Sequence, residues 1–294
     1  MRSHHPTADA RPARAAPASH QQRRGAELRR LTAEALGTAS LLAAVVGSGI
    51  VVAQGGDAPA QLFGHAVVVG AALTALILAF GPVSGAHFNP AVTVADAWFG
   101  GLPWPRAARY VAAQLAGAVI GTVFTHATFG LQLVAVATTP RPGMGMAAAE
   151  AAATAGLLVV IFGLVRSGDG RVVAGAVGAY IAAAIVFTAS DAFANPAVTV
   201  GRVLTDTWTG IAAADVPTFL AGQAAGTLAG IALITWLYHP RPEEAARVVV
   251  PTADEPAVDR AGTADGAADA GAAEDGATRT TADDLSASEP RRPR

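Results

Sequence analysis

The hexapeptide NPAVTV occurs twice in this chain, at residues 89–94 and 195–200. Asn-Pro is typical of a helix start, because Asn is a strong N-cap and Pro is favoured at the first helical position. Each copy is followed by about ten moderately apolar residues, enough for two to three helical turns but too few to cross a bilayer. The motif therefore predicts two short helices, capped by Asn89 and Asn195.

Most of the chain between the two ends is apolar enough to lie in a membrane. The whole chain is 52% hydrophobic and only 14% charged, outside the range of ordinary globular domains, and its charges are concentrated in the two ends. The arginine-rich residues 1–30 and the acidic residues 241–294 are predicted to be disordered tails, which leaves 31–240 as a membrane domain. Six stretches in it have membrane-spanning length: 32–53, 61–82, 105–127, 147–166, 172–189 and 216–238.

The membrane domain consists of two homologous halves. AEALGTASLL at 33–42 matches AEAAATAGLL at 149–158, and YVAAQLAGAVIG at 110–121 matches FLAGQAAGTLAG at 219–230. These blocks and NPAVTV recur in the same order. Each half has three spans, an odd number, so the second half must be inserted upside down, which places a functional site near the bilayer midplane. The predicted fold is an all-α membrane protein with six transmembrane helices and two re-entrant half-helices in an inverted 3+3 repeat.

The inverted repeat predicts that the two half-helices enter from opposite faces and that their N-termini meet. Two positive dipole ends would then face one lumen, which repels cations and protons and admits neutral solutes. Each Asn caps its helix through the side-chain carbonyl and directs its amide N–H₂ into the lumen as a donor. The expected function is a passive channel.

Three segments of this chain resemble the aquaporin, or major intrinsic protein, family. They are SGAHFNPAVT at 84–93, AEALGT at 33–38 and AAQLAGA at 112–118, and the resemblance extends over about 30–240. It implies six tilted helices with two half-helices, usually in a homotetramer with one pore per subunit. The pore motifs it implies are Asn89, Pro90, Ala91, Asn195, Pro196 and Ala197.

The second motif departs from the family at the selectivity filter. Most members have an arginine directly after the second NPA, where this chain has Val198. Counting from the NPA motifs, the resemblance gives Val69, Ala183 and Ala192 as the other filter residues. Such small apolar side chains predict a wide opening for glycerol-like polyols or metalloid acids such as arsenous acid, besides water. FTASDAFANPAVTV also resembles a bacterial subgroup with a non-arginine filter, some of whose members are linked to arsenic handling; a general polyol channel or a water-selective aquaporin is the alternative.

Three polar residues are candidates for the pore wall. His65 lies one turn outward from Val69 and either lines the mouth or is a polar end group at the membrane interface. Arg202 lies four residues after Val198, on the same face of the half-helix. It either reaches the outer vestibule or anchors a loop or faces lipid. His87 precedes the first NPA, and the resemblance places it at the lumen.

Glu34 and Glu150 head equivalent spans of the two halves. An ionisable group inside a span can relay protons. The favoured alternative is structural, because a buried carboxylate can accept the N–H groups that re-entrant loops leave unpaired. Gln114 and Gln223 are expected to hold the loops in the same way.

The arginines predict the orientation of the chain. Six spans put both tails on one side, together with Arg106, Arg109, Arg166, Arg171 and Arg241, and leave Arg141 and Arg202 on the other. By the positive-inside rule both termini are cytoplasmic, in a multi-pass protein of the cell (inner or plasma) membrane.

Rival functions find less support. A secondary active transporter needs a coupling carboxylate at the midplane, and the acids other than Glu34 and Glu150 are expected near loops: Asp57, Asp96, Asp169, Asp191, Asp206 and Asp215. A scaffold with a closed pore is a further alternative, disfavoured by two intact NPA copies. An enzyme is not expected, because the chain has no Cys, no Ser-His-Asp set and no metal-spaced His cluster. No cofactor, metal or nucleic acid is expected, and the partners are lipid, small neutral solutes and further copies of the chain.

Overall fold

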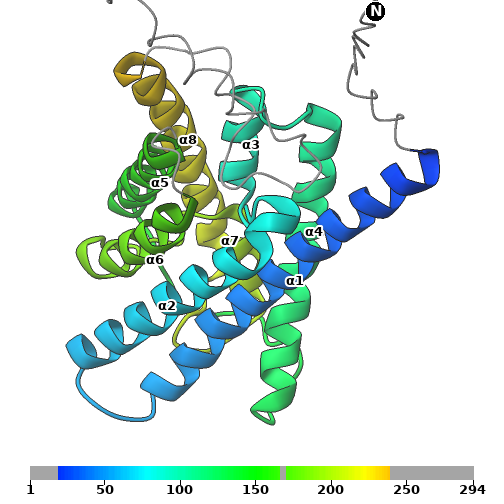
Figure 1. Cartoon of the computed structure of the whole chain (residues 1–294). Coiled ribbons are helices and arrows are strands. Elements are labelled where there is room, and N and C mark those ends of the chain that lie inside the picture. Colours follow the sequence, from blue (N-terminus) through cyan, green and yellow to red (C-terminus); the bar gives the residue numbers. More distant parts are fainter. Residues whose placement is uncertain (1–18, 166–169, 239–294) are drawn as a thin grey trace, which may run out of the picture. The chain divides into compact units, whose positions relative to one another are not determined.

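The computed structural model describes residues 19–165 and 170–238, and its regular structure over these ranges is entirely helical (Figure 1). The elements are α1 (His20–Val52), α2 (Ala58–Ser84), α3 (Pro90–Trp98), α4 (Trp104–Thr128), α5 (Met144–Val165), α6 (Gly170–Phe187), α7 (Pro196–Val203), the 3₁₀ turn η1 (Ala213–Asp215) and α8 (Val216–Leu237). The tail 241–294 and the side chains of Arg166, Asp169, Arg171 and Arg241 lie outside this description.

The six predicted spans correspond to the helices α1, α2, α4, α5, α6 and α8. Five of these helices are long and apolar enough to cross a membrane, and the sixth apolar segment, Val172–Phe187, is shorter. Both predicted half-helices are present as α3 and α7, which lie among the long helices in Figure 1. The end of the bundle that carries the α1–α2 and α4–α5 connections is called the outer end below.

Helix α1 begins earlier than the sequence predicted. It starts at His20, where Ser19 and Gln22 form a capping box, so the prediction of disorder is wrong for residues 20–30. This part of the helix is polar and therefore has no hydropathy signal, but it contains the good helix formers Ala, Leu, Glu and Arg. Its Glu27 pairs with arginines at the start of α4. Residues 1–18 of the predicted tail lie outside the described ranges.

Small residues hold the helices of each half together in the same way. On α4, Gly117 and Gly121 lie against the backbone of α1; on α8, Gly222 and Gly226 lie against the backbone of α5. A Cβ at any of these four positions would overlap the opposing backbone. The glycines therefore permit the close approach that small-xxx-small patterns provide in membrane bundles.

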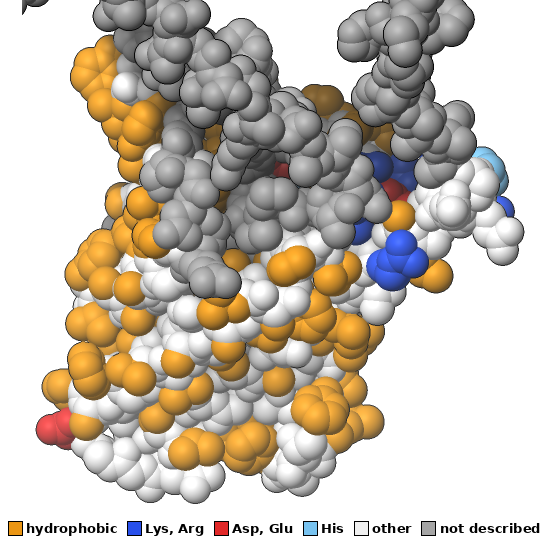
Figure 2. Space-filling view, in the orientation of Figure 1, with side chains coloured by type: hydrophobic (Ala, Val, Ile, Leu, Met, Phe, Trp, Pro, Cys, Tyr) orange, Lys and Arg blue, Asp and Glu red, His pale blue; other side chains and the backbone are white. Residues whose placement is uncertain are grey.

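The sides of the bundle are apolar. Figure 2 shows hydrophobic side chains spread over the visible flank and arginines gathered at the end where α1 begins. Large exposed residues include Phe63, Ile120, Phe124 and Leu228, and Trp98 and Trp104 are exposed close to the α3–α4 connection. Such a surface suits hydrocarbon with aromatic anchors at its edge.

Candidate pore

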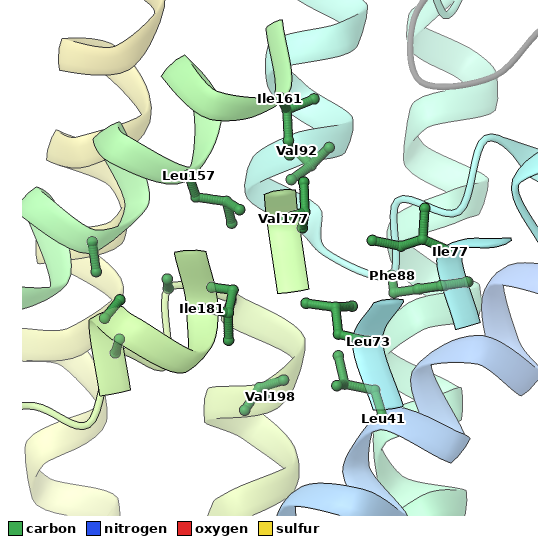
Figure 3. Packing of buried hydrophobic residues seen from close by; sticks show 14 of the residues in the cluster. Leu41, Leu73, Ile77, Phe88, Val92, Leu157, Ile161, Val177, Ile181 and Val198 are labelled. Atoms are coloured by element: carbon green, nitrogen blue, oxygen red, sulfur yellow. The ribbon is translucent and has the colours of Figure 1, made fainter. Parts of the chain in front are cut away.

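A cavity of about 60 Å³ runs between the two halves and is larger than one water molecule needs. Its walls are mainly aliphatic side chains from α1, α2, α5 and α6. Figure 3 shows several of them pointing toward one shared space: Leu41, Leu73, Ile77, Leu157, Ile161, Val177, Ile181 and Val198. Its polar lining residues are His65, His87, Asn89, Asp191, Asn195 and Arg202.

The two asparagines cap the half-helices as the sequence predicted. Asn89 Oδ1 accepts a hydrogen bond from the Ala91 N–H at 2.9 Å, and Asn195 Oδ1 accepts one from the Ala197 N–H at 2.9 Å. Pro90 and Pro196 occupy the first helical positions. Both N-termini therefore point to the cavity that the asparagines line.

The same asparagines also join the two halves. Asn89 Nδ2 donates to the Ala194 carbonyl at 2.8 Å, and Asn195 Nδ2 donates to the Phe88 carbonyl at 2.9 Å. Each side-chain amide has two N–H groups. One crosses to the opposite loop, so at most one per asparagine remains for a solute, instead of the whole amide group expected from the sequence.

Glu34 binds the loop that leads to the first NPA. Its carboxylate is fully buried and accepts hydrogen bonds from the His87 and Phe88 backbone N–H groups at 3.0 and 2.8 Å. The Ser84 hydroxyl and the Gln114 amide donate to it at 2.6 and 2.8 Å. One carboxylate thus satisfies four donors around a loop that has no secondary structure.

Glu150 repeats this arrangement in the second half. It accepts hydrogen bonds from the Phe193 and Ala194 backbone N–H groups at 2.9 and 2.8 Å. The Ser190 hydroxyl and the Gln223 amide donate at 2.7 and 2.6 Å. The two serines are site residues that sequence reasoning missed, although both copies place a serine five residues before the motif asparagine.

Both loops contain residues in the left-handed region. Their φ angles are 51° at Ala86, 49° at Phe88, 60° at Asp191, 40° at Ala192 and 46° at Ala194. Such angles are uncommon for residues other than glycine and persist only where the surroundings hold them. The buried glutamates are the partners that hold these turns.

One of the four predicted filter residues is misplaced. Val69, Ala192 and Val198 line the cavity, whereas Ala183 is exposed on the outside of α6. The cavity is lined instead by Ile181 and Ile185, the residues two positions before and after it. Two positions along a helix turn a side chain by about 200°, so Ala183 faces the opposite way.

His65 lies in the outer half of the cavity wall and is 1% exposed, so it is not an interfacial end group. Its Nδ1 lies 2.8 Å from the Ser48 hydroxyl, and its ring packs edge-on against Trp208, with centroids 5.3 Å apart. These contacts fix the imidazole against the wall.

His87 lies in the inner half of the cavity wall. Its Nδ1 is 3.1 Å from the Thr93 hydroxyl and its Nε2 is 3.5 Å from the Asp96 carboxylate. Asp96 lies near the end of α3, close to the loop that follows, but its side chain is buried, at 3% exposed. Asp191 is in a loop, as expected, but it lines the cavity.

The sequence left three placements open for Arg202: the outer vestibule, a loop anchor or a lipid-facing position. The structure agrees with the first two and excludes the third. Arg202 lines the cavity, and its Nε donates to the Thr209 carbonyl, so it also anchors a loop. At 2% exposed it does not face lipid. Its guanidinium lies over the Phe193 ring, 3.4 Å from the centroid. Sequence reasoning missed Phe193 because an aromatic residue beside a motif carries no distinguishing signal.

Metal ligation has no evident place in this part of the chain. Within 19–165 and 170–238, no three His, Asp or Glu side chains are grouped closely enough to hold an ion.

The comparisons with known proteins agree with one another on the kind of protein that this chain resembles. The sequence model of the family described as Major intrinsic protein matches residues 21–190. The chain is 42% identical over 213 residues to "Aquaglyceroporin AqpS" of Rhizobium meliloti (strain 1021), which covers 72% of this chain and 91% of that protein. It is 30% identical over 240 residues to "Probable aquaporin AqpM" of Archaeoglobus fulgidus, covering 72% and 96% of the two chains. The structure of the aquaglyceroporin from Plasmodium falciparum is similar with a TM-score of 0.58 at 22% identity, over 72% of this chain and 95% of that one.

Proposed function

We propose, from the premise that this chain belongs to the major intrinsic protein family, that it conducts glycerol-like polyols and metalloid acids such as arsenous acid in addition to water. The chain is a multi-pass membrane channel protein and not an enzyme. The relative with 42% identity is named an aquaglyceroporin, which supports permeants larger than water. The observation that carries the proposal is the aliphatic cavity, whose few polar groups include the two motif asparagines.

Neutral solutes suit this wall chemistry. Aliphatic side chains form no hydrogen bonds. A solute hydroxyl in the cavity can therefore replace its hydrogen bonds to water only at the asparagines and at the polar residues near the two ends. The N-termini of α3 and α7 face the same place and oppose cations. A water molecule that accepts from an asparagine N–H turns its hydrogens away from that donor, which interrupts a proton wire.

Val198 is the basis for the proposed breadth of permeants. A valine at the position of the family arginine removes a donor fork and much volume from the filter. Together with Val69 and Ala192, and with Ile181 or Ile185 in place of Ala183, it makes an aliphatic filter. We further infer a homotetramer, with one such pore in each subunit.

Solute fluxes into proteoliposomes test this proposal. Stopped-flow swelling is measured with water, glycerol and arsenous acid for the native protein, Val198→Arg and the size control Val198→Leu. The native protein should equilibrate all three without a Na⁺ or H⁺ gradient, and only the arginine variant should narrow the range toward water. Native protein that passes water but neither solute contradicts the wide filter and identifies a water-selective aquaporin.

One observation favours a second candidate, proton-coupled transport. The buried Asp96 lies 3.5 Å from the cavity-lining His87, and its Oδ1 has no hydrogen-bond partner among the described residues. A titrating carboxylate beside the path is what a coupled transporter requires. Flux that depends on an imposed H⁺ gradient and loses this dependence in Asp96→Asn would replace the channel with a transporter.

A further inference from the structure

The outer half of the cavity contains a guanidinium although the second NPA motif lacks one. Arg202 lies four residues after Val198 on α7, so both side chains are on the same side of the half-helix. Both line the cavity. The end of α7 is at the outer end of the bundle, because the Ala137 N–H of the α4–α5 connection donates to the Val203 carbonyl at 2.8 Å.

Two contacts fix the plane of this guanidinium. Its Nε donates to the Thr209 carbonyl, and its face stacks on the Phe193 ring, 3.4 Å from the centroid. Stacking of this kind is a cation–π interaction, which is strongest when both groups are removed from water. The side chain is therefore held in place beside the cavity.

The charge of this guanidinium is only partly compensated. The nearest carboxylate is Asp191, whose Oδ2 is 2.6 Å from Arg141 Nη1 but 4.0 Å from Arg202 Nη2. A distance of 4.0 Å is too long for a hydrogen bond. Arg141 is further tied to the loops by Asp215, which accepts from its backbone N–H, and by the carbonyls of Gly210 and Trp208. Asp191 is thus committed to Arg141.

The Nη2 group of Arg202 is an unused donor. It is buried and has no hydrogen-bond acceptor among residues 19–165 and 170–238. A buried donor without a partner is unfavourable unless something else supplies an oxygen. Arg202 lines the cavity, so a hydroxyl or oxo oxygen that reaches Nη2 from the cavity would satisfy this donor.

We propose that Arg202 is the specificity-determining residue of the outer pore. Its positive charge excludes cations at the outer mouth, and its free N–H groups bind the oxygen of an uncharged hydroxylated solute. The guanidinium absent at Val198 is thus supplied one helical turn further out, where it leaves the filter wide. This inference rests on the proposed channel function.

The test compares Arg202→Met, Arg202→Lys and native full-length protein in proteoliposomes. Arg109→Met is the matched control, because Arg109 is an exposed arginine at the other end of the bundle. Water swelling reports an open, folded channel, and collapse of an imposed K⁺ or H⁺ gradient reports cation leakage. The methionine variant should leak cations at least about tenfold faster than native protein, whereas the lysine variant and the control stay tight. The glycerol-to-water permeability ratio of the methionine variant should also fall below that of the native protein.

Each other outcome is decisive. A methionine variant that conducts water and is as tight to cations as native protein overturns the inference and leaves Arg202 as a loop anchor. Native protein that moves neither water nor glycerol refutes the channel itself, and the inference with it. Should the methionine variant fail to fold, Arg202→Gln keeps a donor for the Thr209 carbonyl without the charge, and the same comparison applies.

Discussion

Glu34 and Glu150 each accept hydrogen bonds from two backbone N–H groups that would donate to backbone carbonyls in a helix. Each carboxylate accepts two backbone N–H groups, a serine hydroxyl and a glutamine amide, and each is fully buried. A neutral side chain has too few acceptors for this. The loop geometry therefore accounts for a carboxylate at each of these two positions.

Glu34→Gln should lower the free energy of unfolding by about 3 kcal/mol or more, because the new amide replaces an acceptor oxygen and leaves buried donors unpaired. Glu27→Gln is the control. Its carboxylate pairs with Arg106 and Arg109 in a partly solvated setting and should change stability by less than about 1 kcal/mol. Thermal unfolding in detergent measures both. A proton current in the native protein that disappears in Glu34→Gln would instead support a relay.

Ile181 and Ala183 provide a test of the corrected filter. Ile181→Trp adds volume to a lined cavity and should slow glycerol flux at least about tenfold. Ala183→Trp places the same ring on the exposed side of α6 and should change the flux by less than about twofold. Stopped-flow glycerol swelling compares the two, and the reverse order of effects would restore Ala183 to the filter.

The pore residues next to the motifs could be predicted because Asn-Pro carries its own capping chemistry. The residues on α6 could not, because a count from the motif passes through a loop whose length the motif does not set. Ile181 and Ile185 have no polar signature to correct such a count. Asp191 and Phe193 become recognisable only when Arg141 and Arg202 are placed around them.

At the scale of elements, the fold depends on four glycines at two equivalent helix crossings. Gly121 on α4 faces the backbone near Ala39 on α1, and Gly226 on α8 faces the backbone near Ala151 on α5. Since the helices approach to backbone contact there, no side chain can adjust to make room. These crossings set the separation of the helices that surround α3 and α7.

Gly121→Ala should destabilise the protein by about 1–3 kcal/mol, because its Cβ would enter the opposing backbone. Gly175→Ala on α6 should be neutral or stabilising by about 0.5–1 kcal/mol, since nothing lies near its Cβ and alanine favours helix. Melting temperatures in detergent give the two signs. Equal effects would mean that the α1–α4 crossing has room for a methyl group at Gly121.

Element positions were more predictable than element ends. The hydropathy of each span identifies the lipid-crossing part of a helix but says nothing of a polar extension, so the start of α1 was missed by 12 residues, His20 against 32. The half-helices were found because the capping signal marks their first residue directly.

At the scale of the whole molecule, the even number of long helices puts the starts of the two tails at the same end. Tags at the N- and C-termini should therefore both be protected from protease in intact cells and cleaved only after permeabilisation. This prediction rests on the positive-inside rule, applied to the arginines around the α1 start and to Arg106 and Arg109. A tag inserted at Gly55, in the α1–α2 connection, should show the opposite accessibility, and cleavage of either terminal tag in intact cells would contradict the orientation.

The crossed amides of Asn89 and Asn195 bear on how such a molecule can be made at all. Each loop takes a hydrogen bond from the other half and gives one back, between residues that occupy equivalent places in the repeat. Neither loop is complete when the first three spans have been synthesised, so the path through the protein closes only after the last half has inserted. Because the exchange is reciprocal, two separate copies of a single half could make the same pair of bonds across a two-fold axis. The single chain keeps the two-fold geometry of such a dimer. Because its halves are joined in one chain, the surroundings of Val92 and Val198 can differ although the two motifs are identical.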